Sequence, residues 1–398
     1  MIPVEKIKIL AHESATMVKE IREHLHANPE LSFNEVQTAQ YIAELLEKWD
    51  IPFKSNIGGN GIVAWIKSPL KGKNIALRAD IDALPIDEKN NIPYCSVNKG
   101  VMHACGHDLH TASLLGTLYI LNQVKETFSG SVWAIFQPAE EKLPGGAQAM
   151  LNDPFFADKQ FDAVIAQHVF PDLPAGTIGI KGGKYMASTD EIYVTLNGKG
   201  GHAATPHQIN DTVLIASQII VSLQQIVSRH ALPTIPTVLS FGKFIANGAT
   251  NIIPNEVILE GTFRTFNEEW RSKALSLITK IIRETANTHG IEAEIKIVNG
   301  YPALINSEQL ASKISEISKI YMGNEQVKEL EMRMTAEDFA YFAQKYPAVM
   351  YRIGTGGTDE SSFPLHSPQF NINPSVYTYA HGLMAWITIK LLENENMD

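Results

Sequence analysis

The chain has 398 residues, of which 44% are hydrophobic and 19% charged, the composition of a folded globular protein rather than a disordered one. At roughly 100 to 200 residues per domain, this length predicts two or three domains. Subtracting 33 Lys and Arg from 43 Asp and Glu leaves a net charge of −10, so the protein repels phosphate backbones and anionic membrane surfaces. We therefore expect neither nucleic acid nor a membrane as partner.

Two further features indicate a cytoplasmic protein. The only cysteines, Cys95 and Cys105, are too few for a disulfide framework and suit a reducing compartment. Residues 1–20 carry charges every few positions without a continuous apolar core, which argues against a signal peptide. No apolar run approaches the roughly 18 residues that a membrane-spanning helix needs.

Apolar residues at helical spacing predict two helices at the start of the chain, over 4–25 and 34–49, with Asn34 as the N-cap of the second. Short β-rich runs then alternate with helical stretches, with strands expected at 61–66, 74–79, 131–137 and 163–168 and a helix at 109–125. This alternation predicts an α/β layer with a mixed, largely parallel sheet flanked by helices. Functional side chains in such sheets gather at the carboxyl ends of the strands.

The pattern changes after Gly182 and Gly183. The order strand–helix–strand–strand–helix–strand predicts a ferredoxin-like α+β unit, with elements at 191–196, 211–228, 238–244, 257–266, 268–289 and 292–298. The chain then returns to helices at 307–321 and 336–344, a strand at 348–353 and a helix at 376–392. Because this last stretch is too small to stand alone, we predict one domain from 1–185 and 300–398, with a second domain, 186–299, inserted into it.

The most informative segment is His103–His110, which holds three histidines, a cysteine and an aspartate in eight positions just before a predicted helix. Any one of them alone is more often a packed thiol or a hydrogen-bonded loop histidine. Three of the 13 histidines so close to one of two cysteines favour a metal site.

Three other segments carry the same chemistry more weakly. Glu140 and Glu141 follow a predicted strand, and burying two adjacent carboxylates requires a cation. In a metallohydrolase one would bind metal while the other accepts the proton of the metal-bound water, and a solvated acidic pair at a helix start is the alternative. His168 ends an apolar strand and His366 lies between two prolines, so both are held rigidly, although a histidine that caps a carbonyl and a surface-loop histidine are the simpler interpretations.

Together these segments resemble peptidase family M20, and most of all its amidohydrolase branch of hippurate hydrolases, N-acyl-amino-acid deacylases and auxin-conjugate hydrolases. The resemblance covers nearly the whole chain, with motifs in the family's order: ALRADIDALPI (76–86), MHACGHDLHTA (102–112), FQPAEE (136–141), HVFPDLPAG (168–176), GKGGHAATPH (198–207), ATNIIPNE (249–256), GTFRTF (261–266), MTAEDFAYF (334–342) and PLH (364–366). It implies a cocatalytic two-metal amidohydrolase with an inserted lid domain that commonly dimerises.

By position, the resemblance also implies a set of site residues. Glu140 matches the general base of the branch, Asp82 the carboxylate that orients a ligand or base, and the metal ligands are matched by Cys105, His107, Glu141, His168 and His366. The wider family has a histidine at the place of Asp80 and an aspartate that bridges its metals, whereas this chain has the Cys-Gly-His segment of the branch. Thiolate ligation suits zinc and the branch is also associated with manganese, so the identity of the two ions stays open.

In the inserted domain, the resemblance implies that His202 stabilises the oxyanion in the site of a neighbouring subunit and that Asn251 and Arg264 hold the substrate's carboxylate. Residue types alone indicate only a turn histidine, a turn asparagine and a surface arginine. The expected function is hydrolysis of N-acyl-amino acids by a homodimer. A dipeptidase or carboxypeptidase of the same family, and a catalytically silent metal-binding protein, are the alternatives.

Overall fold

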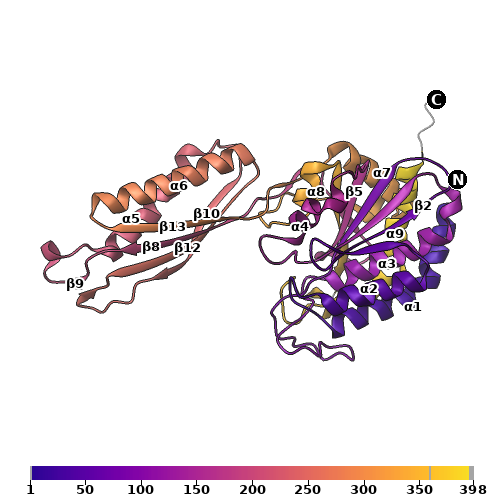
Figure 1. Ribbon diagram of the computed structural model, residues 1–398, viewed down its shortest axis with the longest axis horizontal. Helices are drawn as coiled ribbons and strands as arrows, with labels where there is room; N and C mark the ends of the chain where they lie inside the picture. Colours follow the sequence, from indigo (N-terminus) through magenta and orange to yellow (C-terminus); the bar gives the residue numbers. More distant parts are fainter. Residues whose placement is uncertain (1, 358–359, 394–398) are drawn as a thin grey trace. The chain divides into compact units, whose positions relative to one another are not determined.

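The computed structural model describes residues 2–357 and 360–393, which form two compact units (Figure 1). Unit 1 contains the residues up to Tyr185, then Ile305–Glu331, and those from Asp338 onward. Unit 2 contains Met186–Leu304 and the short segment Met332–Glu337. Two short strands, β7 (Gly183–Met186) and β14 (Leu304–Asn306), lie where the chain passes between the units.

Unit 1 is built on an eight-stranded sheet of order β1-β2-β4-β3-β5-β16-β6-β15. The four strands β4, β3, β5 and β16 are mutually parallel, whereas β1, β2 and β6 pair antiparallel to their inner neighbours. The bounds are β1 (Phe53–Ile57), β2 (Gly61–Lys67), β3 (Asn74–Asp80), β4 (Ser131–Gln137), β5 (Ala163–Pro174), β6 (Ile178–Ile180), β15 (Val327–Glu329) and β16 (Ala348–Gly356). The predicted mixed, largely parallel sheet is thus confirmed.

Helices flank this sheet, and one of the two most buried carries part of the site. Their bounds are α1 (Val4–Ala27), α2 (Val36–Lys48), α3 (His107–Gln123), α4 (Gly146–Asn152), α7 (Glu308–Met322), α8 (Ala340–Lys345) and α9 (Ala380–Leu392). α3 and α9 contact each other and β3, and α1 packs on both helices. Nearly all residues of α3 are buried, so its first turn is held rigidly against the strand ends.

Several helix starts differ from the prediction, including that of α3, which begins at His107 rather than at 109. The N-cap of α2 is Glu35 rather than Asn34, and the side chain of Glu30 accepts the amide protons of Gln37 and Thr38. The Glu30 carboxylate therefore accepts the amide protons at the start of the helix, a role for which the sequence pattern predicted Asn34. α8 begins at Ala340 rather than at 336, and α9 at Ala380 after a separate 3₁₀ turn, Pro374–Thr378.

Unit 2 has the predicted ferredoxin-like arrangement: a four-stranded antiparallel sheet of order β10-β12-β8-β13 with two helices. The bounds are β8 (Asp190–Asn197), α5 (Thr212–Gln225), β10 (Thr237–Ile245), β12 (Glu256–Thr265), α6 (Glu268–Thr288) and β13 (Glu292–Asn299). A small two-stranded sheet, β9 (Gly201–His202) with β11 (Ile252–Ile253), follows the end of the sheet where Asn197 pairs with Glu256.

One helical stretch of unit 2, Thr212–His230, is long and apolar enough to cross a membrane by length and composition, whereas the sequence analysis found no such run. Its residues Ile215, Ile219 and Leu223 belong to the buried core of unit 2. Packing within the domain therefore accounts for much of its apolar character.

Candidate metal centre

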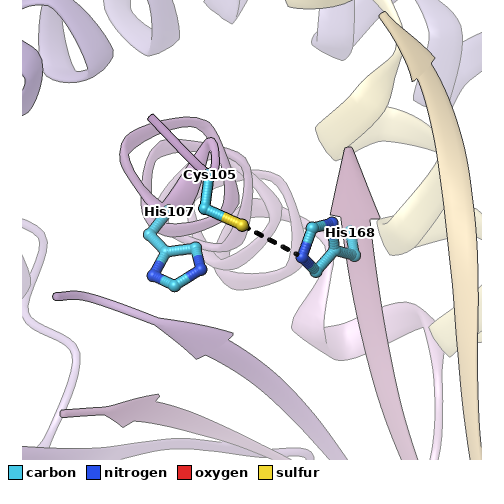
Figure 2. A group of neighbouring side chains, drawn as sticks. All are labelled: Cys105, His107 and His168. Atoms are coloured by element: carbon cyan, nitrogen blue, oxygen red, sulfur yellow. Dashed lines mark hydrogen bonds between the residues drawn. The ribbon is translucent and has the colours of Figure 1, made fainter. Parts of the chain in front are cut away.

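The five side chains matched to metal ligands come from different parts of unit 1 and converge. Cys105 precedes α3, and His107 is the first residue of that helix. Glu141 follows β4, and His366 lies in the loop after β16. His168 lies within β5 rather than at its end, because this strand continues to Pro174. Figure 2 shows Cys105 between His107 and His168.

Their ligand atoms form overlapping groups in which all atoms lie within 4.8 Å of one another. One group is Cys105, His107 and His168, and a second is Cys105, Glu141 and His366. The Cys105 sulfur is 3.7 Å from Nε2 of His168, and Nε2 of His366 is 3.4 Å from Oε1 of Glu141. Two three-residue groups that share one thiol are an arrangement suited to two neighbouring cations.

Hydrogen bonds orient two of the imidazoles. Nδ1 of His107 lies 2.9 Å from the carbonyl oxygen of Asp82 and 3.2 Å from its carboxylate, and Nδ1 of His168 lies 2.8 Å from the carbonyl oxygen of Val169. Because these oxygens only accept, each Nδ1 carries a proton, and in the neutral ring that a metal requires each Nε2 has a lone pair. This is the tautomer that a metal-ligating histidine needs, and for His107 it is Asp82 that accepts the proton of Nδ1.

The residues present fit divalent cations. Within the described part of the chain, Nε2 of His107 and Oε1 of Glu141 are buried without a hydrogen-bond partner. The nearby Cys105 sulfur and Glu141 carboxylate raise the pKa of His366 to about 10. Burial and the charge of Glu141 raise the pKa of the Cys105 thiol. The pocket thus concentrates negative charge that protons or cations neutralise, and thiolate, imidazole and carboxylate are the donors of zinc and related ions.

Backbone geometry places the loop ligands. Gly106 has φ +80°, and a Cβ there would lie 2.5 Å from a Val169 methyl, so only glycine fits between Cys105 and His107. His366 has φ +63°, rare for a residue with a side chain, and its amide donates to the carbonyl of Ala104. This hydrogen bond joins the loop after β16 to the Cys105 segment.

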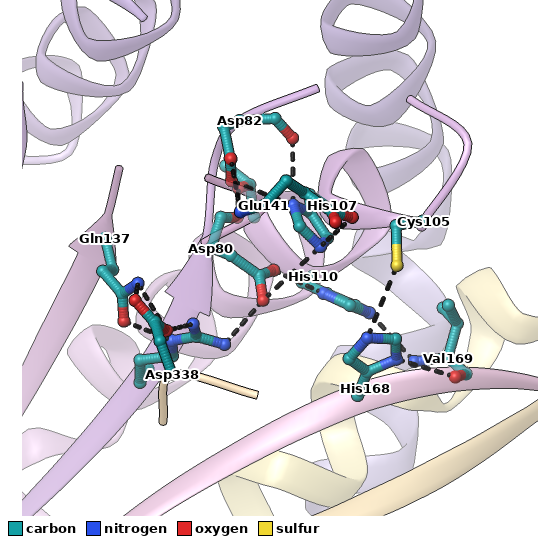
Figure 3. A network of polar contacts seen from close by, with 12 residues as sticks. Asp80, Asp82, Cys105, His107, His110, Gln137, Glu141, His168, Val169 and Asp338 are labelled. Carbon is teal, nitrogen blue, oxygen red and sulfur yellow. Dashed lines mark hydrogen bonds and ion pairs between the residues drawn. The ribbon is translucent and has the colours of Figure 1, made fainter. Parts of the chain in front are cut away.

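A buried polar network lies beside these ligands and was not assigned from the sequence (Figure 3). Nδ1 of His110 lies 2.6 Å from Asp80, and Nε2 of His110 accepts the amide proton of Val169. Arg78 donates to Asp80 and to Asp338. Burial acts to raise the pKa of Asp80, but Arg78, His107 and His110 together outweigh it and keep that pKa well below its usual value. Asp338 comes from a segment 260 residues after Arg78, so no local pattern connects the two.

The base candidate Glu140 is 6% exposed, and one of its oxygens lies within 4.8 Å of ligand atoms of His107 and Glu141. Oδ2 of Asp82, in turn, accepts the amide proton of Glu141 at 3.0 Å and the hydroxyl proton of Ser32 at 2.7 Å. The adjacent glutamates therefore lie beside the ligand group rather than in solvent.

The three predicted residues of unit 2 do not lie together. His202 is exposed in β9. Asn251 lies near it, because the carbonyl of Asn251 accepts the amide proton of Ala203, the residue after His202. Arg264 lies at the other end of β12, half-buried, with Nη1 donating to the carbonyl of Met334 at 2.9 Å. At roughly 3.3 Å per residue, the eight positions from Glu256 to Arg264 span about 26 Å.

A fold with a parallel-sheet edge that carries thiolate, imidazole and carboxylate donors defines a metal-dependent hydrolase class, and the comparisons agree. The model of "Peptidase family M20/M25/M40" matches residues 76–387. An N-acyl-L-amino acid amidohydrolase of Geobacillus stearothermophilus is 41% identical over 305 residues, 77% of this chain and 82% of that protein. A thermostable carboxypeptidase 2 of Saccharolobus solfataricus is 35% identical, over 96% of this chain and 98% of that protein.

Among solved structures, the YxeP protein of Bacillus subtilis, described as a dinuclear metal binding peptidase from the M20 family, matches with a TM-score of 0.82 and 34% identity, over 96% of this chain and 99% of that one. The chain belongs to peptidase family M20/M25/M40. As predicted, it is an enzyme, a metal-dependent amidohydrolase.

Proposed function

We propose that this enzyme hydrolyses the amide bond of N-acyl-amino acids, with Glu140 as general base and two divalent ions held by Cys105, His107, Glu141, His168 and His366. The observation that carries the proposal is the position of Glu140: a buried carboxylate next to, but distinct from, the five converging ligands. A carboxylate in this position can accept the proton of the attacking water, which is the role of a general base in a metallohydrolase.

When bound, the two ions would polarise a carbonyl and lower the pKa of water. Glu140 would accept a proton from the attacking water and pass it to the leaving amine nitrogen. Asp82 would hold His107 in its Nδ1-protonated tautomer and fix the backbone of Glu141. Cys105, His107 and His168 are buried, which excludes bulk water from their side of the site and strengthens these interactions, whereas His366 is exposed.

His202 is the proposed oxyanion donor. Its Nδ1 accepts the amide proton of Ala204 at 3.1 Å, so in the neutral ring the proton is on Nε2, which is free to donate to a developing negative charge. Arg264 would hold the substrate's carboxylate, because a guanidinium offers a planar pair of donors.

The distance between Arg264 and the pair His202 and Asn251 within unit 2 decides whether all three can act on one substrate molecule. His202 and Asn251 lie beyond the Asn197 end of the sheet, whereas Arg264 lies near the end where the chain enters and leaves the unit. One chain cannot bring residues separated by about 26 Å of strand to the same small substrate. We therefore infer a homodimer in which His202 and Asn251 serve the site of the second copy.

Mixing two inactive variants tests this dimer. A Glu140→Ala chain keeps His202, and a His202→Ala chain keeps its base and ligands, so a heterodimer has one complete site. Recovery of activity after subunit exchange is expected. Heterodimers that are verified by mass spectrometry and stay inactive would overturn the arrangement.

Steady-state rates of the metal-reconstituted enzyme test the substrate class. We expect higher kcat/KM on acetyl-, benzoyl- and indoleacetyl-amino acids than on dipeptides. The carboxypeptidase-named relative favours peptidase activity as the second candidate, and a preference for dipeptides would establish it instead. No turnover on either class, with both metals bound, would favour a silent metal-binding protein. A cytoplasmic location and zinc or manganese as the ions complete the proposal, and elemental analysis of the enzyme from its native source tests the metals.

A further inference from the structure

We propose that Glu35 is a positioning residue for the hydrolytic reaction: it holds the amide of Ala139, the residue before Glu140, and so sets the direction of the Glu140 side chain. The inference rests on the proposed role of Glu140 as base. Glu35 is not one of the residues matched to the family's site, and it lies 105 positions before Glu140 in the chain.

The contacts of Glu35 point to the base rather than to its own helix. Its side chain is fully buried, although it is the N-cap of α2 and makes no capping hydrogen bond there. Oε1 accepts the amide proton of Ala139 at 2.9 Å and that of Phe33 at 2.8 Å, and Oε2 accepts a proton from Nδ2 of Asn60 at 3.1 Å. A buried carboxylate that contacts only donors is held in one orientation.

The residue that Glu35 holds has an unusual backbone. Ala139 has φ +51°, in the left-handed region that residues with a Cβ rarely adopt, and its carbonyl accepts the amide proton of Gly146. A Cβ at Gly146 would lie 1.8 Å from the carbonyl oxygen of Pro138, so this turn is tightly closed. Such a conformation persists only where the surroundings enforce it, and the hydrogen bond to Glu35 is one of those constraints.

Two carboxylates therefore hold the backbone on both sides of the base. The amide before Glu140 donates to Glu35, and the amide after it donates to Asp82. The connection between α1 and α2 contributes to both interactions, because Ser32 donates to Asp82 while Glu35 accepts from Ala139. Asp82 fixes the ligand side of the glutamate pair, and Glu35 fixes the other side.

The experiment measures kcat, KM, metal content and thermal stability for Glu35→Ala and Glu35→Gln. Misplacing a base by about 1 Å can cost up to about a hundredfold in rate. We expect Glu35→Ala to lower kcat by about tenfold or more while KM stays within about threefold and two metals remain bound. Glu35→Gln keeps an oxygen acceptor for the Ala139 amide and should recover most of kcat.

The matched control is Glu30→Ala. Glu30 is in the same connection and also accepts backbone amide protons, those of Gln37 and Thr38, but in the described part of the chain the hydrogen bonds of its side chain include none to a proposed site residue. It should lower thermal stability with little change in kcat. If the two alanine variants lose kcat equally, Glu35 has only a structural role and the proposal is overturned.

A double-mutant cycle with Ala139→Gly isolates the mechanism. Glycine adopts positive φ readily, so the turn should depend less on Glu35, and Glu35→Ala should cost several-fold less kcat in that background than in the parent. Equal costs in both backgrounds would overturn the proposal. If Glu35→Ala does not fold, Glu35→Asp, which keeps the charge but shortens the reach, takes its place in the cycle.

Glu140→Gln, measured alongside, separates this proposal from the proposed function. If Glu140→Gln stays active, Glu140 is not the base, and this result contradicts the proposed function whatever the Glu35 variants show. If Glu140→Gln is inactive but Glu35 and Ala139 show no coupling, only the positioning role of Glu35 is overturned.

Discussion

The proposed functional residues of the two units differ in their burial and in their hydrogen bonds. In unit 1, His107 and His168 are buried and their tautomers are set by hydrogen bonds to Asp82 and Val169. In unit 2, His202 and Asn251 are exposed on a small hairpin, and Arg264 is at the far end of the sheet. Binding charged metals requires rigid ligands in a closed pocket, whereas residues that meet a substrate or a second subunit must stay accessible.

The base in unit 1 offers the strongest test of this difference. We expect Glu140→Ala to lower kcat by about 10²- to 10⁴-fold, because a positioned general base contributes that much. Metal content should stay at two ions per chain, since the five proposed ligands remain. Activity near that of the parent, with both metals bound, would remove Glu140 from the mechanism.

In unit 2, His202→Ala should lower kcat by about 10²- to 10³-fold, the usual effect of losing one oxyanion donor. Because His202 is exposed, thermal stability should hardly change, and the metals of unit 1 should be retained. Elemental analysis and a melting curve check both points. A loss of bound metal in this variant would mean that the two units do not divide the work as proposed.

Cys105→Ser should weaken binding of at least one ion, because a neutral hydroxyl replaces a thiolate that both ligand groups share. We expect the apparent affinity to fall by about tenfold or more, as it often does even when a residue supporting a ligand is lost. Titration against a chelator of known affinity measures the change. Unchanged affinity for both ions would leave Cys105 as a packed thiol.

The smallest expected effect is on acid stability. Burial acts to raise the pKa of Glu88, but hydrogen bonds and the charge of His26, with the amide of Ser96, outweigh it and lower that pKa from 4.5 to about 2. The ionised form is therefore favoured in the folded state. Its contribution to the free energy of unfolding is complete above pH 4.5 and is lost as the pH falls towards 2.

Glu88→Gln should reduce this loss, so the free energy of unfolding should change less between pH 4.5 and 2 in the variant than in the parent. Tryptophan fluorescence reports mainly on unit 1, which holds Trp49, Trp65, Trp133 and Trp386 but not Trp270. Identical pH dependence in both proteins would show that another group controls acid unfolding.

Much of the fold follows from local patterns in the sequence. The period-2 runs of unit 2 predicted β8, β10, β12 and β13 to within a residue or two, because one face of each strand is packed against α5 and α6. Cys105 and His107 could also be predicted from the local sequence, because a thiol and an imidazole two residues apart form a recognisable motif. Cys105 lies just before α3 and His107 is its first residue, and the apolar residues that follow them in the helix account for their burial.

Other features depend on contacts between distant segments, which leave no periodic signal. The side chain of Glu30 rather than that of Asn34 accepts an amide proton at the start of α2. Arg78 donates a hydrogen bond to Asp338, and Glu35 accepts the amide proton of Ala139. Nothing near any of these residues in the sequence indicates its partner, because a buried charge needs a donor or counter-charge wherever the fold brings one. Motifs and periodicity thus determined which residues are candidates for the site and in which helices, strands and loops they lie. Only the tertiary structure decided how each is oriented, and that His202 and Arg264 lie at opposite ends of the same unit.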